Sequence, residues 1–302
     1  MKKLLVVCGP TASGKTALAV ECAHRLNGEI VSCDALLVYC GLNVGTAKPG
    51  KEEMRGIPHH MIDICEPQES FSVSDFETRA LPIVEDIFSR GKTPILCGGT
   101  GFYMNAILYK SSFGKTPADA AVRKKYERYA AEKGREALHG LLKEVDPESA
   151  EKLHYNDLVR VVRALEIYEL TGRKKSEQQD GTVARYDFRA VMIDYPRVEL
   201  YRRIERRVDE MMHEGLVAEV LGLLAAGVPE TAQCMQGIGY KEVVESLKNG
   251  DNLSTMSDII KKNTRNYAKR QLTFFKKTEN LLKIAPKEME AMAQEIEEFY
   301  DD

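Results

Sequence analysis

An eight-residue stretch near the N-terminus, GPTASGKT at 9–16, has the residue types and spacing of a phosphate-binding loop. It matches the P-loop pattern in full and lies between an apolar stretch and a helical pattern. In such a loop the backbone N–H groups surround phosphate oxygens, the lysine adds positive charge, and the last hydroxyl usually holds Mg²⁺. The residues expected to contact phosphate are Gly9, Pro10, Thr11, Ala12, Ser13, Gly14, Lys15 and Thr16, with Thr16 as the Mg²⁺ ligand. The pattern does not say which molecule carries the phosphates.

Polar side chains also stand at the ends of other apolar stretches. Asp34 follows EIVSC, and Thr100 ends TPILCGGT. Asp63 and Asp194 have similar positions, and each could be the Mg²⁺ partner of an ATP-using kinase or an ordinary solvated carboxylate. The N-K-x-D pattern of guanine-specific proteins is absent from the sequence. These local patterns therefore leave a P-loop kinase open.

The elements that must position these residues alternate between strand and helix in the first third of the chain. Strands are predicted at residues 4–8, 29–33, 61–65, 93–100 and 188–195. A helix is predicted at 74–90, where Ser74 and Glu77 have the spacing of a capping box. Continuous apolar strands between helices are typical of a parallel sheet covered on both faces, so the predicted fold class is α/β with a P-loop sheet core. Ligands bind at the carboxyl ends of such strands, where the phosphate loop, Asp34 and Thr100 are expected to converge.

The strand pattern stops between residues 115 and 181, which are charged and helical. We interpret this segment as an all-helical insertion domain, so that 1–114 and 182–302 form the P-loop core with C-terminal helices. After the strand at 188–195 only helices are expected, including a long one at 259–277.

The composition excludes several classes of protein. The 302 residues are 43% hydrophobic and 29% charged, which indicates a folded globular chain, and the net charge of −3 argues against a surface coated in basic residues. Seven cysteines without C-x-x-C spacing indicate reduced thiols and no zinc knuckle. No apolar run approaches the ~20 residues of a membrane span, and nothing predicts export, so a cytoplasmic location is expected.

The segment VSCDALLVYCGLNVGTAKP, residues 31–49, together with the P-loop resembles the tRNA isopentenyltransferases, also called tRNA dimethylallyltransferases. Further similar blocks follow in order along nearly the whole chain. They are IPHHMIDICEPQESFSVSDF at 57–76, GGTGFY at 98–103, RVVRALEIYELTGR at 160–173, RRIERRVDEMMHEGLVAEV at 202–220, GIGYKE at 237–242 and TRNYAKRQLTFF at 264–275. The family usually follows the aspartate with Ser, a variable residue and Gln, whereas this chain has Ala35, Leu36 and Leu37. Cys40 replaces a common Arg, and Phe274 replaces a common Trp.

The resemblance implies that a dimethylallyl group moves from dimethylallyl diphosphate to the exocyclic amine of the adenosine immediately 3′ of a tRNA anticodon. Pyrophosphate leaves, so the P-loop would hold a diphosphate, with Mg²⁺ as cofactor. An aryl amine is a poor nucleophile whose proton must leave as the C–N bond forms, and Asp34 is expected to accept it. Lys15, Thr16 with its Mg²⁺, and an arginine would stabilise charge on the departing diphosphate. Arg207 is preferred for that arginine, with Arg203, one helical turn earlier, as the alternative.

The target base must leave the stack of the anticodon loop, and RNA loops are read by basic and aromatic side chains. Arg160 and Arg163 lie opposite an apolar stripe on their predicted helix, and Lys261, Arg265 and Lys269 share one face of theirs. The residues expected to contact tRNA are Asp34, Ala35, Leu36, Leu37, Thr100, Val159, Arg160, Val161, Val162, Arg163, Lys261, Arg265 and Lys269. Thr100 could approach the diphosphate or the base.

Two other functions stay open at this point: a P-loop small-molecule kinase using ATP, and a non-catalytic RNA-binding module that keeps a phosphate site. A monomer is expected. The sequence does not identify which tRNAs are modified.

Overall fold

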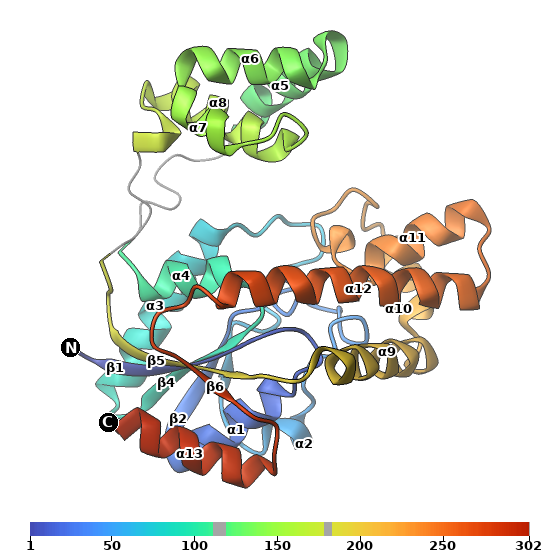
Figure 1. The fold of residues 1–302 in the computed structure, drawn as a ribbon. Coiled ribbons are helices and arrows are strands. Elements are labelled where there is room, and N and C mark those ends of the chain that lie inside the picture. The colour runs from blue at the N-terminus through green and yellow to red at the C-terminus, as the bar shows by residue number, and fades with distance from the viewer. Residues whose placement is uncertain (111–118, 178–182, 302) are drawn as a thin grey trace. The chain divides into compact units, whose positions relative to one another are not determined.

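The computed structural model describes residues 1–110, 119–177 and 183–301, and the chain forms two compact units (Figure 1). Unit 1 consists of Met1–Leu108 and Arg185–Asp302, and unit 2 consists of Tyr109–Ala184. Unit 2 therefore starts before and ends after the segment 115–181 expected as an insertion. The expected boundaries at 114/115 and 181/182 lie outside the described residues.

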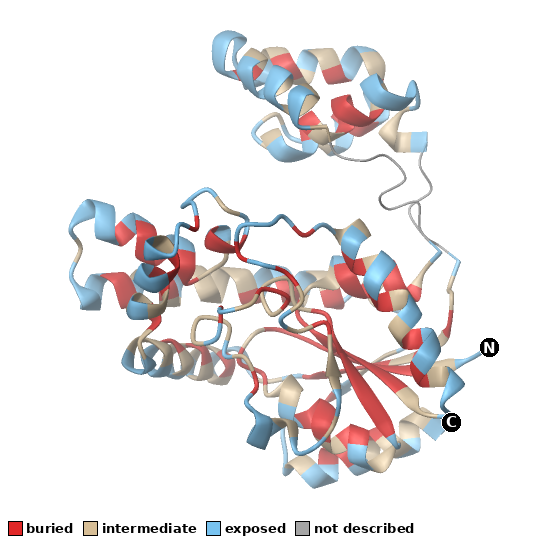
Figure 2. Ribbon diagram, turned by 180° about the vertical axis from the view of Figure 1, so that it is seen from behind, coloured by how far each residue is buried: buried red, intermediate tan, exposed pale blue. Residues whose placement is uncertain are grey.

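Unit 1 is built on a six-stranded sheet in which every pairing is parallel, which confirms the α/β class. The strand order is β3-β2-β4-β1-β5-β6. The bounds are β1 (Lys3–Cys8), β2 (Gly28–Ser32), β3 (His59–His60), β4 (Thr93–Gly98), β5 (Asp187–Ile193) and β6 (Leu281–Ile284). The central strands are almost wholly buried, as Figure 2 shows, because helices cover both faces and every residue of the apolar runs finds a neighbour.

Two edges of the sheet differ from the prediction. The strand predicted at 61–65 is wrong: β3 ends at His60, and the left-handed φ angles of Met61 (63°) and Asp63 (53°) turn the chain away from the sheet. Cys65 keeps only an isolated bridge to Tyr39. The expectation of helices alone after the fifth strand is also wrong, because β6 pairs with β5 at the other edge. Half-exposed edge strands this short give little periodicity for a sequence to reveal.

The helices of unit 1 cover the sheet on two sides (Figure 1). α1 packs with α13 on one face, and α3 packs with α4 on the other. The bounds are α1 (Lys15–Arg25), α2 (Lys51–Met54), α3 (Val73–Ser89), α4 (Gly101–Leu108), α9 (Arg197–Glu214), α10 (Leu216–Ala225), α11 (Tyr240–Asn249), α12 (Leu253–Phe275) and α13 (Met289–Asp301), with a 3₁₀ turn at Cys234–Gln236. In the described parts of the chain, no helix is long and apolar enough to cross a membrane.

α3 begins one residue earlier than the sequence predicted, and its N-cap lies two residues earlier. Ser72 is its N-cap and accepts a hydrogen bond from the Asp75 N–H at 3.2 Å, while Asp75 accepts one from the Ser72 N–H at 2.8 Å. This is a capping box with an aspartate in place of the usual glutamate, so the predicted Ser74–Glu77 box is wrong. Glu77 instead pairs with Arg185 at 2.8 Å.

Unit 2 is helical and has its own apolar core. Its helices are α5 (Ala120–Lys133), α6 (Arg135–Val145), α7 (Pro147–Lys152) and α8 (Leu158–Thr171), followed by a 3₁₀ turn at Lys175–Glu177. Val161 and Val162 of α8 are buried in this core, so the expectation that they contact tRNA is wrong. Arg163 forms an ion pair with the buried Glu166. Val159 and Arg160 are exposed, and Arg160 pairs with Asp157.

Candidate active site

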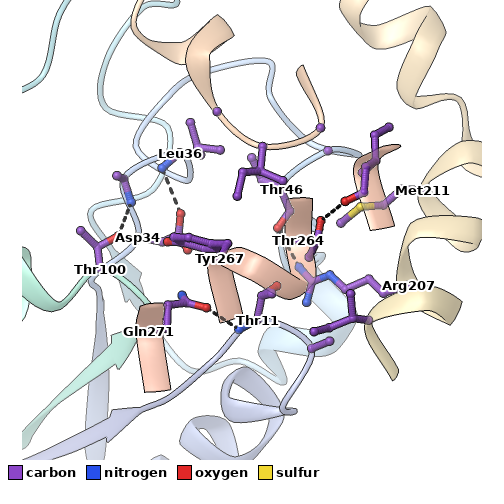
Figure 3. Close-up of a pocket in the computed structure, with 18 of the residues that line it drawn as sticks. Thr11, Asp34, Leu36, Thr46, Thr100, Arg207, Met211, Thr264, Tyr267 and Gln271 are labelled. Atoms are coloured by element: carbon purple, nitrogen blue, oxygen red, sulfur yellow. Dashed lines mark hydrogen bonds between the residues drawn. The ribbon is translucent and has the colours of Figure 1, made fainter. Parts of the chain in front are cut away.

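A cavity of about 390 Å³ opens at the carboxyl edge of the unit 1 sheet (Figure 3). The loops after β1, β2 and β4 form its floor, and α9, α12 and the segment 233–239 form its walls. Of the residues predicted from the sequence, the cavity is lined by Thr11, Ala12, Lys15, Asp34, Ala35, Leu36, Thr100 and Arg207. The structure thus brings together the phosphate loop, Asp34 and Thr100, as the positions of their strands predicted.

The phosphate loop connects β1 to the first turn of α1 and has the backbone of an anion-binding turn. Gly9 and Gly14 have φ angles of 138° and 81°, and Ala12 one of 62°, so the chain wraps around the space in front of the helix. The Lys15 ammonium reaches back to the Pro10 carbonyl at 3.4 Å. Burial and the neighbouring Arg207 guanidinium lower the pKa of Lys15. Two partly buried cations so close together favour an anionic ligand, which would offset their mutual repulsion and the cost of their desolvation.

Asp34 stands at the end of β2, where the ends of β2 and β4 are tied together. The Cys33 N–H donates to the Cys97 carbonyl at 2.7 Å, and the Thr100 N–H donates to the Cys33 carbonyl at 3.0 Å. The Thr100 hydroxyl accepts from the Ala35 N–H at 3.0 Å, and one Asp34 carboxylate oxygen accepts from the Leu36 N–H at 3.0 Å. These bonds hold the carboxylate at the cavity wall, so it is oriented before any substrate arrives.

The two candidate arginines of α9 have different environments. Arg207 lines the cavity and donates to the Thr46 carbonyl at 3.0 Å, and its Nε is buried without a partner among the described residues. Burial lowers the pKa of Arg207, and the Asp34 carboxylate opposes that shift. Arg203 instead donates to the Ala12 carbonyl at 2.8 Å and lies over the Tyr195 ring, behind the phosphate loop. Arg207 is therefore the arginine that faces the cavity, whereas Arg203 supports the loop.

A clamp that the sequence did not reveal holds the segment around Gly45. The Glu219 carboxylate accepts three backbone N–H groups, from Asn43, Val44 and Gly45, at 2.7–3.0 Å. It also accepts the Tyr240 hydroxyl at 2.6 Å. A Cβ at position 45 would lie 2.6 Å from the Tyr240 ring, which explains the glycine. The clamp fixes the carbonyl of Thr46 that receives Arg207, so it positions the arginine indirectly.

α12 contributes a wall of the cavity that was also missed. Ile260, Thr264, Tyr267 and Gln271 all line it, at the spacing of one helix face. Gln271 is 5% exposed, accepts from the Thr11 N–H at 2.9 Å and donates to the Gly99 carbonyl at 3.0 Å. This periodicity was present in the sequence, but the prediction followed the basic residues of the same helix instead.

The basic residues of α12 do not form the face that was expected. Lys261 pairs with Asp209 of α9 at 2.6 Å, and Arg265 pairs with Glu205 of α9 at 2.6 Å, so these two face another helix. The expectation of one open phosphate track through Lys261, Arg265 and Lys269 is therefore wrong, although Lys269 is exposed. The exposed cations on and just beyond α12 that have no carboxylate partner in the described chain are Lys262, Lys269, Arg270, Lys276 and Lys277.

Some predicted residues lie outside the cavity lining. Leu37 does not line it and instead accepts the Asp63 N–H at 3.1 Å through its carbonyl. Thr16 lies at the first turn of α1, where its hydroxyl interacts with the Cys97 thiol. Within the described residues, no group of three His, Cys, Asp or Glu side chains is arranged to hold a metal ion.

The fold and the cavity define a class: P-loop α/β proteins in which the phosphate loop faces a strand-end carboxylate and a partly buried arginine. The family model described as IPP transferase matches residues 37–278. The chain belongs to the IPP transferase family.

Similar proteins support this assignment over most of the chain. It is 46% identical to a tRNA dimethylallyltransferase of Acetivibrio thermocellus, over 93% of this chain and 91% of that protein. It is 48% identical to one of Caldanaerobacter subterraneus subsp. tengcongensis, over 91% and 89%. The solved tRNA isopentenylpyrophosphate transferase of Bacillus halodurans is similar with a TM-score of 0.73 and 39% identity, covering 100% of this chain and 97% of that one. A eukaryotic dimethylallyltransferase acting on tRNA has a TM-score of 0.78 and 30% identity, covering 91% and 70%.

Proposed function

We propose that the protein transfers a dimethylallyl group from dimethylallyl diphosphate to the exocyclic amine of the adenosine immediately 3′ of a tRNA anticodon. The observation that carries the proposal is the meeting of Lys15, Asp34 and Arg207 in one cavity of a chain from this family. The two cations suit a diphosphate, and the carboxylate suits an amine that must lose a proton. The names of the relatives favour this transfer over a kinase reaction.

In the proposed mechanism the C–O bond between the allylic carbon and the diphosphate breaks, and the bonding electrons leave with pyrophosphate. The adenine nitrogen forms the new C–N bond with that carbon, and Asp34 accepts the amine proton. Lys15, the loop amides and Arg207 stabilise the growing charge on the leaving group, which is larger in the transition state than in the substrate. The hydrogen bond from Arg207 to the Thr46 carbonyl orients the guanidinium before the reaction, so the side chain needs little reorganisation in the transition state.

We propose Thr16 as the protein ligand of a Mg²⁺ ion. Mg²⁺ is bound through few protein oxygens together with substrate phosphates and water, so a single hydroxyl beside the phosphate loop fits this ion. The ion would neutralise charge on the diphosphate oxygens.

The remaining proposals concern tRNA. The exposed cations on and just beyond α12, together with the exposed Arg160 of unit 2, carry the positive charge that binds RNA phosphates. Ala35, Leu36 and Thr100 line the cavity that would receive the flipped base. We propose a monomeric enzyme that acts on tRNA in the cytoplasm.

Mass spectrometry of tRNA nucleosides tests the proposed reaction. After incubation of unmodified tRNA with the protein, dimethylallyl diphosphate and Mg²⁺, isopentenyladenosine should appear at the position after the anticodon. A parallel reaction with ATP in place of the prenyl donor should consume no ATP. Consumption of ATP with transfer of phosphate to a small molecule would support a kinase, and tight tRNA binding without prenyl transfer would support a binding module.

Replacing Lys15 with alanine should weaken binding of dimethylallyl diphosphate and leave tRNA affinity nearly unchanged. Lys15 lies in the phosphate loop, where its charge meets the diphosphate and not the RNA backbone. Isothermal titration with each substrate separately measures both affinities. An equal loss of both would mean that Lys15 does not serve the diphosphate in particular.

Replacing Lys262, Lys269 and Lys276 together with glutamine should weaken tRNA binding and flatten its dependence on salt. These lysines recur at seven-residue spacing, so they lie along one line of the helix surface. Each lost phosphate contact removes about 0.7 to 0.9 of the slope of log K against log salt.

The control for this triple variant replaces Lys2, Lys248 and Lys287, which are exposed lysines of unit 1 away from α12 and make the same change in net charge. Each of these three pairs with a glutamate. The control should leave the slope unchanged. If both triple variants have the wild-type slope, the line on α12 is only a solvated surface.

A further inference from the structure

Two aromatic side chains lie outside the cavity, next to its Thr100 wall. Phe102 is on the first turn of α4 and is 56% exposed, whereas Phe274 is on α12 and is half-buried. Their rings pack edge to face, with 5.6 Å between centroids and an interplanar angle of 63°. We call this pair the aromatic ledge. Exposed single apolar residues are common, so exposure alone gives the ledge no function.

The ledge is packed tightly against the segment that follows β4. Phe274 packs against Gly101 so closely that a Cβ there would lie 2.0 Å from its ring. Phe274 also contacts the buried Phe275, with 5.5 Å between ring centroids. Gly101 and Phe102 directly follow Thr100, whose N–H and hydroxyl are bonded to the end of β2. The exposed ring is therefore held at a set place beside the cavity that contains Asp34.

Two cations lie close to Phe274 along the chain. Arg270 is four residues before it, one turn away on α12. Lys277 lies in the turn that follows α12, where its N–H donates to the Phe274 carbonyl at 3.1 Å. Both are exposed, and neither has a carboxylate partner in the part of the chain that the structure describes. Arg270 also lines the cavity. An exposed aromatic ring beside unneutralised cations is the combination by which proteins bind single-stranded nucleic acid: bases stack on the ring, and phosphates meet the cations.

Resting on the proposed function, we propose that the aromatic ledge stacks one of the two nucleobases that flank the target adenosine in the anticodon loop. Movement of the target base into the cavity removes a stacking partner from its neighbours. The exposed face of Phe102, next to the cavity and beside Arg270 and Lys277, replaces that lost partner. The ledge thus stabilises the opened loop and not the prenyl donor.

Affinity measurements with an RNA anticodon stem–loop test the ledge. Phe102→Ala should weaken stem–loop binding by about 5- to 100-fold, the size expected when one base loses an aromatic partner. The loss should be the same at every salt concentration, because no ionic contact is removed. Phe102→Trp should bind as well as the wild type, and dimethylallyl diphosphate should bind every variant equally. The matched control is Leu253→Ala, which removes another exposed apolar side chain (63% exposed) and should change nothing.

Abasic substitution of each flanking nucleotide gives a second measurement that does not depend on the variant folding. In the wild type, an abasic site at one flanking position should weaken binding by about as much as Phe102→Ala. The two changes together should then cost no more than either alone. Additive losses at both positions, or unchanged affinity in Phe102→Ala, would overturn the ledge. Absence of prenyl transfer by the wild type would overturn the proposed function instead, so the two failures are distinguishable.

Discussion

Replacing Asp34 with asparagine should lower the single-turnover rate of prenyl transfer by about 10²-fold or more, which is the effect of losing a general base. The amide keeps the shape of the side chain and can still accept the Leu36 N–H that orients it. It cannot accept the amine proton. Rapid-quench measurement of prenylated stem–loop RNA, with enzyme in excess, gives the rate. Both substrates should bind within a few-fold of the wild type, because proton acceptance matters chiefly in the transition state.

Asp194→Asn is the matched control for this prediction. Asp194 also follows a strand of the sheet, but it does not line the cavity, and it pairs with Lys283 at 3.9 Å. Its removal should leave the rate unchanged. A near wild-type rate in Asp34→Asn would place the base elsewhere. An equal fall in rate in the two variants would show that the rate depends on the removal of any negative charge at a strand end and not on a base at Asp34.

Replacing Arg207 with alanine should lower the same rate by about 10²- to 10³-fold, as expected for the loss of one preorganised donor to a developing anion. Arg207 is the arginine of α9 that lines the cavity, and it acts on charge that grows as the C–O bond breaks. The affinity for dimethylallyl diphosphate should fall less than the rate. Arg207→Lys should recover part of the rate, because an ammonium restores the charge without the planar donor group.

Arg203→Ala separates a role in charge stabilisation from support of the phosphate loop. Arg203 bonds to the Ala12 carbonyl and lies away from the cavity lining, so its loss should weaken diphosphate binding more than it slows the step after binding. The contrary result, a larger fall in rate for Arg203→Ala than for Arg207→Ala, would exchange the two roles.

The centre of the site could be predicted from the sequence because its signals are local. A phosphate loop needs its glycines, lysine and hydroxyl within eight residues, and Asp34 and Thr100 each end an apolar strand. In a parallel sheet, strand ends meet at one edge, so convergence followed from the strand pattern alone. The resemblance to a family then identified the chemistry that the loop serves.

What could not be predicted depends on which way a helix faces. Lys261 and Arg265 were indistinguishable in sequence from Lys262 and Lys269, and only the position of α9 decides that the first two are neutralised. Glu219 looks like an ordinary helical carboxylate until the loop that it holds is known. Such assignments need the packing of elements that are far apart in the chain, and no local pattern records it.

The side chain of Gln271 joins two loops that would serve different substrates. Its oxygen accepts from the phosphate loop at Thr11, and its nitrogen donates to the Gly99 carbonyl beside Thr100. The amide offers an acceptor and a donor on separate atoms of one tip: glutamate would lose the donor, lysine the acceptor, and asparagine is one methylene shorter. The same helix carries the outward cations, so a shift of α12 on RNA docking would move the anchor of the phosphate loop. The two substrates then share an energetic coupling, and by thermodynamic reciprocity each must change the affinity of the other by the same factor.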